Sequence, residues 1–201
     1  MSALELIGLR QKPADPLEVT HFRGLFLDLS TRGIQKRQGP ERWQAFLATL
    51  PAALRREAEA PRGSYDWVEP WIVGDLMSAY GAWSGEDLRE FRGELYADQV
   101  VTVRHQWVLK LMSPELLVRQ VPRFYQFYIR GGKIWTEQVT PKSGLVCIEA
   151  KAPYPDWSEY VLPSWLRRAL ELCGAREAQV VYDPPSDPGR PHLHRFWARW
   201  S

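Results

Sequence analysis

The sequence predicts an α+β fold, with a helical N-terminal two-thirds packed on a small antiparallel sheet formed mainly by the C-terminal third. Helical spacing of apolar residues dominates up to Ile129, whereas strand patterns gather after it around a single helix. This separation argues against a doubly wound parallel sheet, and the short connections favour antiparallel pairing. We expect residues 1–201 to form one domain, because a chain of this length can bury a sizeable core.

A helix is predicted at the centre of the chain, between Ser113 and Gly132. Ser113 can cap the first turn, and Pro114 suits the first helical position. The apolar residues that follow recur every three or four positions, which gives the helix one apolar face. Pro122 removes an amide donor within this run and predicts a kink or two abutting helices. Gly131 and Gly132 are expected to end the helix, since glycine enters the left-handed region without a steric penalty.

Strands are predicted on both sides of the last helix, which should end at Gly174. Lys133–Thr140 and residues 145–150 are expected to form a hairpin, because β-branched and apolar residues flank a proline and glycine turn. Residues 178–182 are expected to form a short third strand. Residues 193–200 alternate between polar and apolar side chains, which is typical of a strand with one buried face. This last strand should close the sheet.

The N-terminal half is expected to be helical. The spacing in residues 17–29 favours a helix, although Thr20 and Gly24 leave a strand open, and residues 30–39 should form a polar connection that ends before Pro40. Further helices are predicted at 40–50, 52–62, 71–81, 84–96 and 100–112.

Composition excludes several classes of function. The net charge is +2, and 26 basic and 24 acidic residues are spread along the chain, so no concentrated basic face for nucleic acid is expected. No apolar run approaches the roughly 20 residues of a membrane helix, and the first residues do not resemble a secretion signal. Cys147 and Cys173 lack the close spacing of zinc or redox sites, so we expect buried free thiols in a cytoplasmic protein.

Several elements together carry a resemblance to a known family. They are the opening at 23–26, the helix start at 113–115, the aromatic run ending in two glycines at 124–132, the helix at 165–174 and the closing strand at 196–201. In these elements the chain resembles an uncharacterised paralogous family of myxobacterial proteins of about this length. That family looks related to the vinyl-reductase and haem-nitric-oxide-binding group of ligand domains, which also includes a vesicle-tethering subunit fold.

The resemblance implies a compact domain with a cavity between helices and sheet, used to sense or carry small or hydrophobic molecules, and often dimeric. Haem-binding relatives use a histidine on a helix, together with a tyrosine, a serine and an arginine that bind the haem propionates. Here His105 is the helical histidine candidate, and the set that binds the propionates is not found. Relatives that bind zinc through clustered cysteines have no counterpart, since His192 and His194 occupy that region. We therefore expect neither haem nor zinc, and no other cofactor.

The sequence offers little for catalysis. A nucleophile elbow of glycine, serine and glycine does not occur, and no pair of carboxylates stands in a recognisable catalytic context. His192 and His194 would share one face of a strand, as two metal ligands must, but we interpret them as exposed histidines at a strand end. An enzyme is the less favoured class.

Two interpretations remain for the high aromatic content of the chain, which has ten Trp, eight Tyr and seven Phe residues. The first is a non-enzymatic small-molecule-binding or sensory domain with an aromatic-lined apolar cavity. The residues assigned to that cavity are Trp71, Tyr80, Trp107, Phe124, Tyr125 and Tyr128, with His105 as a polar contact. The alternative is a protein–protein interaction module, self-associating or partner-binding, with no small ligand. Its surface would present Trp135, Trp157, Trp197 and Trp200.

Overall fold

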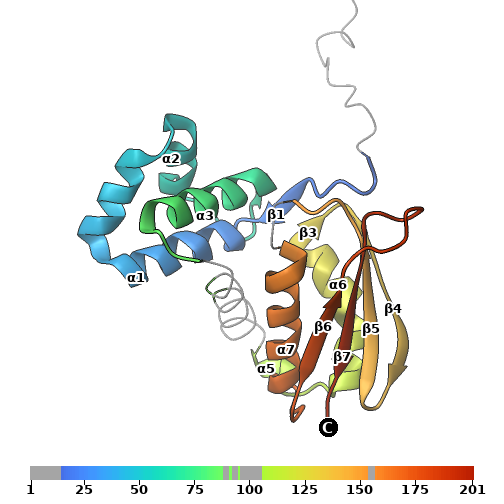
Figure 1. Ribbon diagram of the computed structural model, residues 1–201. Helices are drawn as coiled ribbons and strands as arrows, with labels where there is room; N and C mark the ends of the chain where they lie inside the picture. Colours follow the sequence, from blue (N-terminus) through green and yellow to red (C-terminus); the bar gives the residue numbers. More distant parts are fainter. Residues whose placement is uncertain (1–14, 88–90, 92–94, 96–105, 154–156) are drawn as a thin grey trace, which may run out of the picture.

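The computed structural model describes residues 15–87, 91, 95, 106–153 and 157–201. Its elements follow the chain in the order β1 (His21–Arg23), α1 (Leu25–Thr49), α2 (Ala52–Glu59), β2 (Trp67–Val68), α3 (Pro70–Ser84), α5 (Gln106–Leu109), α6 (Pro114–Tyr128), β3 (Ile129–Arg130), β4 (Lys133–Thr140), β5 (Ser143–Glu149), the π-helical turn η1 (Trp157–Val161), α7 (Leu162–Leu172), β6 (Gln179–Asp183) and β7 (Leu193–Arg199). Helices α1 to α3 lie to one side of the C-terminal sheet (Figure 1). The predicted α+β class is confirmed.

The C-terminal sheet has four antiparallel strands in the order β4-β5-β7-β6. Helix α6 packs on β4 and β5, and α7 packs on β6 and β7, so both helices cover one face (Figure 1). Ile134, Leu145 and Val180 all belong to this sheet, as the sequence predicts. Within the part of the chain that is described, no helix is both long enough and apolar enough to cross a membrane.

The predicted hairpin and closing strand are confirmed. In the hairpin, Trp135 lies opposite Cys147. On β7 the alternation buries His194, Phe196 and Ala198 on the side of α6 and α7, because successive side chains of a strand point to opposite faces.

The expected helix over residues 17–29 is wrong in its first part, where the strand alternative holds. His21–Arg23 is β1, the middle strand of a small antiparallel sheet of order β2-β1-β3. Phe22 points into the core and pairs with Val68 and Ile129 on either side. These partners lie far away in sequence, so tertiary pairing overrides the local spacing.

The polar connection expected at 30–39 is also wrong, because these residues continue α1. Ile34 is fully buried on the inner face of this helix, and the hydroxyl of Ser30 donates to the carbonyl of Phe26 four residues back. The helix is interrupted at Gly39, with φ of 77° and ψ of 169°, and resumes at Pro40. The predicted start at Pro40 therefore corresponds to a real break between two helical segments.

Helix α6 begins as predicted and ends earlier than predicted. The amide of Leu116 donates to the hydroxyl of Ser113 at 3.2 Å, and the helix runs as one element through Pro122. It ends at Tyr128, because Ile129 and Arg130 form β3 and pair with β1. The two predicted glycines then follow, both with positive φ.

Candidate functional site

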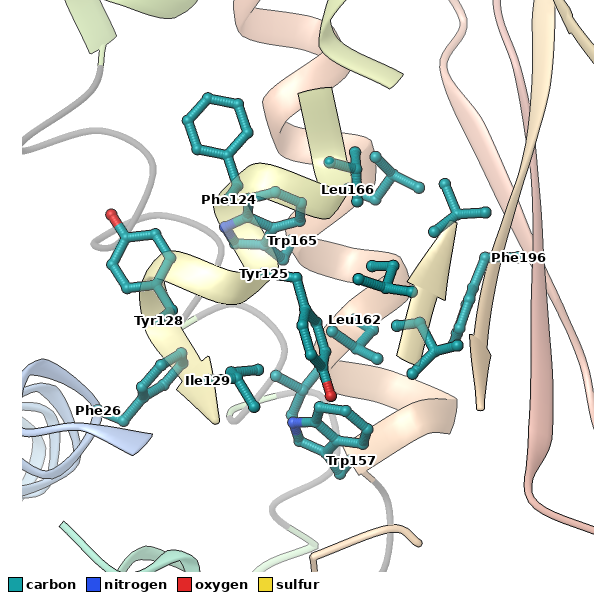
Figure 2. Close-up of a pocket in the computed structure, with 15 residues that line it drawn as sticks. Phe26, Phe124, Tyr125, Tyr128, Ile129, Trp157, Leu162, Trp165, Leu166 and Phe196 are labelled. Carbon is teal, nitrogen blue, oxygen red and sulfur yellow. The ribbon is translucent and has the colours of Figure 1, made fainter. Parts of the chain in front are cut away.

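An apolar pocket lies between α6, α7, η1 and the covered face of the C-terminal sheet, and Figure 2 shows its lining residues. The cavity within it has a volume of about 50 Å³. It is lined by Phe26, Val121, Phe124, Tyr125, Tyr128, Ile129, Ile134, Val146, Ile148, Trp157, Val161, Leu162, Trp165, Leu166 and Phe196. All of these side chains are aliphatic or aromatic, so the interior suits uncharged apolar groups.

Helix α6 supplies one wall. Val121, Phe124, Tyr125 and Tyr128 are spaced by three and four residues, so they share one face of the helix. Tyr125 reaches inward toward Trp157, and their ring centroids are 6.3 Å apart in an edge-on arrangement (Figure 2). The same periodicity that makes the helix amphipathic therefore builds the wall.

The sheet supplies the opposite wall. Val146 and Ile148 alternate along β5, and Phe196 lies directly opposite Val146 on β7. Because cross-strand partners point to the same face, these three side chains converge.

The π-helical turn η1 closes one end of the pocket. Trp157 is only 1% exposed and stacks on Phe22 with centroids 6.5 Å apart. Val161, four residues later in the same turn, also lines the cavity. Single π-turns often mark functional positions in helices. The ring of Trp157 thus contacts both the pocket and Phe22 in the core beneath the small sheet.

The main polar contact of the pocket belongs to Tyr125. Its hydroxyl donates to the carbonyl of Gly131 at 3.2 Å, and burial raises the pKa of this phenol well above its ordinary value. The phenol is therefore neutral and already engaged. The phenol oxygen of Tyr128 points away from Tyr125 and the cavity (Figure 2). The pocket has no acid or base positioned for chemistry among its lining residues.

The structure brings together three of the residues that the sequence assigns to a cavity, Phe124, Tyr125 and Tyr128. It places three others elsewhere. Trp71 is 42% exposed and donates its indole N–H to Glu69, and Trp107 is 69% exposed. Helical spacing predicts that a residue shares a stripe with its neighbours, but it does not specify what that stripe packs against.

Tyr80 is buried, but in a separate cluster among the N-terminal helices. Its ring lies 5.5 Å from that of Phe46, and its hydroxyl accepts a hydrogen bond from Gln38 at 2.5 Å. His105 lies outside the described residues.

Sequence reasoning did not assign Phe26, Trp157, Trp165 or Phe196 to the cavity, although all four line it. A signal existed for Phe196, since the alternation of its strand places it on the buried face. Phe26 and Trp157 come from segments far apart in sequence, and no local pattern links them.

Two of the four rings expected on a partner surface are buried. Trp157 lies in the pocket wall, and Trp200 is buried with its indole N–H donating to the carbonyl of Pro141 at 2.8 Å. Trp135 and Trp197 are half-buried on the face of the sheet opposite α6 and α7, where they cover Leu145.

Both cysteines are free and buried. Burial raises the pKa of the Cys147 thiol, and likewise that of Cys173, to about 11. Both thiols are therefore protonated at neutral pH. Among the described residues, no group of three or more His, Cys, Asp or Glu side chains is arranged to hold a metal ion.

The expectation of exposed strand-end histidines is wrong for His194. It is buried on the inner face of β7, stacked on Tyr182, and its Nδ1 lies 2.8 Å from the Tyr182 hydroxyl. Burial lowers the pKa of His194; a hydrogen bond with the Ala150 backbone opposes this effect, and the nearby His192 adds to it.

We expect His194→Gln to reduce the loss in the free energy of unfolding that occurs as the pH falls below neutral. Because the folded state lowers the pKa of His194, the unfolded chain binds the proton more readily, and stability is lost as the pH falls below about 6.5. This group contributes at most about 1.4 kcal/mol per pH unit to the slope. Urea unfolding at pH 7, 6 and 5 measures it, with His21→Gln as the control. If the free energy of unfolding depended on pH equally in wild type and His194→Gln, His194 would not be the group responsible.

No protein-family model matches this chain, and no curated protein matches it in sequence. Solved structures of H-NOX proteins do match in fold. The unliganded Fe(II) H-NOX protein from K. algicida gives a TM-score of 0.68 at 10% identity, over 89% of this chain and 96% of that one. The H-NOX protein from S. oneidensis in the Fe(II)NO state gives 0.64 at 10% identity, over 89% and 99%. A T. Tengcongensis H-NOX mutant gives 0.61 at 7% identity, over 89% and 96%. The chain therefore has the H-NOX fold.

Because one of the similar structures is described in terms of haem distortion, haem is the group that this fold implies. The apolar pocket between α6, α7 and the sheet does not fit it. A cavity of about 50 Å³ is far below the roughly 300–1,000 Å³ of ordinary ligand pockets. Its lining contains no histidine, cysteine or methionine, and the neutral Tyr125 phenol disfavours the phenolate that would bind iron.

Proposed function

We propose that this protein is a non-enzymatic small-molecule-binding or sensory domain that takes an uncharged apolar molecule in the pocket beneath α6 and α7. The observation that carries this proposal is the lining of the cavity, which consists entirely of aliphatic and aromatic side chains. The H-NOX fold supports it, since similar structures are described in unliganded, oxygen-bound and NO-bound states.

We assign the ligand contacts to Phe124, Tyr125 and Tyr128, and keep His105 as a candidate polar contact. Leu162 and Trp165 are only partly buried at the edge of the same pocket. A ligand larger than a few atoms requires these side chains to move, because the cavity is smaller than the roughly 150 Å³ that holds benzene in an engineered core. We propose that residues 1–201 act as one cytoplasmic domain, related to the myxobacterial paralogous family that the sequence resembles.

Xenon is the probe that tests the cavity as it stands, because it enters dry apolar cavities without needing a polar partner. We expect a saturable ¹²⁹Xe chemical-shift change with the wild-type protein. Val146→Phe fills the cavity from β5 and should abolish the change, whereas Val180→Phe adds the same atoms at a position of the same sheet outside the lining.

Retention of the xenon signal in folded Val146→Phe would overturn the assignment of the cavity. If Val146→Phe does not fold, Leu162→Phe makes the same test at the pocket edge. Native mass spectrometry of the purified protein then reports whether a small molecule copurifies. A bound mass that is lost in the filled variant and kept in Val180→Phe places the ligand in this pocket.

A homodimer is the second candidate, favoured by the sheet face that carries Trp135 and Trp197. Neither α6 nor α7 covers this face, and Val181 on it is 59% exposed. Two copies packed through this face would bury the three side chains. The same native spectra test it: Val181→Glu should convert a dimer to a monomer, and a wild-type monomer at all concentrations would exclude it.

A further inference from the structure

The outer face of the small sheet presents a cluster that the pocket does not use. Phe22 of β1 points into the core, so its neighbours His21 and Arg23 point outward. In the antiparallel register Arg23 lies opposite Trp67 of β2, and His21 lies opposite Arg130 of β3. All of these side chains therefore stand on one face.

Arginine and aromatic side chains are packed together on this face. The guanidinium carbon of Arg23 lies 3.8 Å from the centre of the Trp67 ring, and that of Arg130 lies 4.1 Å from it. Arg23 also donates to the carbonyls of Phe127 at 2.9 Å and Tyr65 at 2.5 Å. These contacts hold the rings in place before any partner binds, which lowers the ordering cost of binding.

Two rings of the cluster remain open to solvent. Tyr65 is 56% exposed and Phe127 is 40% exposed, and they pack edge-to-face with centroids 6.1 Å apart. Arg123 lies one turn before Phe127 on α6 and is also exposed. We call Arg23, Tyr65, Trp67, Arg123, Phe127 and Arg130 the arginine-aromatic patch.

The charge of this patch is not balanced within the described chain. Arg23, Arg123 and Arg130 form no ion pair with any described carboxylate. Elsewhere on the surface, arginines such as Arg55 and Arg119 pair with a glutamate on their own helix. The patch thus combines uncompensated positive charge with exposed rings.

We propose that the arginine-aromatic patch docks an acidic segment of a partner protein. Tyr, Trp and Arg are the residue types that dominate binding energy in protein interfaces, and three unpaired guanidiniums complement carboxylates. Single-stranded nucleic acid fits less well, because base stacking needs open ring faces. Arginines already lie over the rings of Trp67 and Phe127, and Tyr65 packs edge-to-face on Phe127. A membrane surface fits less well, because Arg23 holds the rings of Trp67 and Phe127 against the small sheet, so these rings do not project freely toward a bilayer.

The arginine-aromatic patch lies next to the apolar pocket, so a partner bound at the patch would contact the helix that lines the pocket. Phe127 of the patch packs against Tyr128 of the pocket at 5.0 Å, so both sites share the last turn of α6. The docking inference itself does not depend on a ligand in the pocket, and its test is made on the protein as purified.

The test uses a labelled peptide of glutamates around one leucine and one phenylalanine, and a matched peptide with glutamine in place of every glutamate. Fluorescence anisotropy should show binding of the acidic peptide only, weakened by salt. Arg123→Glu and Arg130→Glu should each weaken it about tenfold. Arg56→Glu makes the same charge change on the exposed face of α2 and should leave binding within about twofold.

Three results would overturn the proposal. The first is failure of the acidic peptide to bind the wild-type protein. The second is an equal loss with Arg56→Glu, which would mean that only bulk charge matters. The third is peptide binding that Arg123→Glu and Arg130→Glu leave unchanged while binding of phosphatidylserine vesicles is lost in both variants, which would assign the patch to a membrane surface.

Discussion

Replacing Gly131 with alanine should lower the free energy of unfolding by about 3 kcal/mol or more. Gly131 has a φ of +94°, which costs a residue with a side chain about 1–2 kcal/mol. A β-carbon there would lie 1.9 Å from the backbone oxygen of Glu18. That oxygen cannot rotate away, so the segment before β1 has to move off the end of β3. Urea unfolding monitored by circular dichroism measures the loss.

Gly174→Ala is the matched control. Gly174 also has a positive φ, of +88°, but a β-carbon there would meet nothing within 4 Å. It should therefore cost only the backbone penalty of about 1–2 kcal/mol. If the two variants lost the same stability, the close approach of Glu18 to Gly131 would not constrain the fold.

Replacing Trp157 with alanine should cost about 3–5 kcal/mol, the usual range for a buried tryptophan. This side chain is almost fully buried between Phe22 and Tyr125. The truncation also joins the space of the lost ring to the cavity that Trp157 lines. We therefore expect added indole to restore part of the lost stability, because it refills an apolar space of its own shape. Thermal unfolding with and without indole measures both effects.

Trp71→Ala provides the comparison at a largely exposed position of α3. It should change stability by less than about 1 kcal/mol and should gain nothing from indole. Equal stabilisation of wild type, Trp71→Ala and Trp157→Ala by indole would show binding somewhere other than the enlarged pocket.

The features that could be predicted from the sequence depend on neighbours in the chain. Ser113 and Pro114 start α6 because capping needs only the first turn. The alternation over β7 correctly grouped His194, Phe196 and Ala198 on one face of the strand, since the pleat fixes which side chains point the same way. Of the candidate site, Phe124, Tyr125 and Tyr128 came together in one wall because they share one stripe of one helix.

The errors arose where distant segments compete with local spacing. Phe22 lies in a stretch with helical spacing, yet it is in a strand because β2 and β3 pair on both sides of it. Trp71 and Tyr80 lie on a helix with an apolar stripe, but that stripe packs among the N-terminal helices and leaves Trp71 at the surface.

By itself the sequence determined the class of fold, the start of α6, and the grouping of side chains on the two faces of the closing strand, because caps and alternation act within a few residues. Only the tertiary structure decided that Phe26, Tyr125 and Trp157 meet around one cavity, and that Arg23 and Arg130 meet at Trp67. Each of these contacts joins side chains that are far apart in the sequence. Their position is set by the burial and strand pairing of the whole fold, which no local pattern encodes.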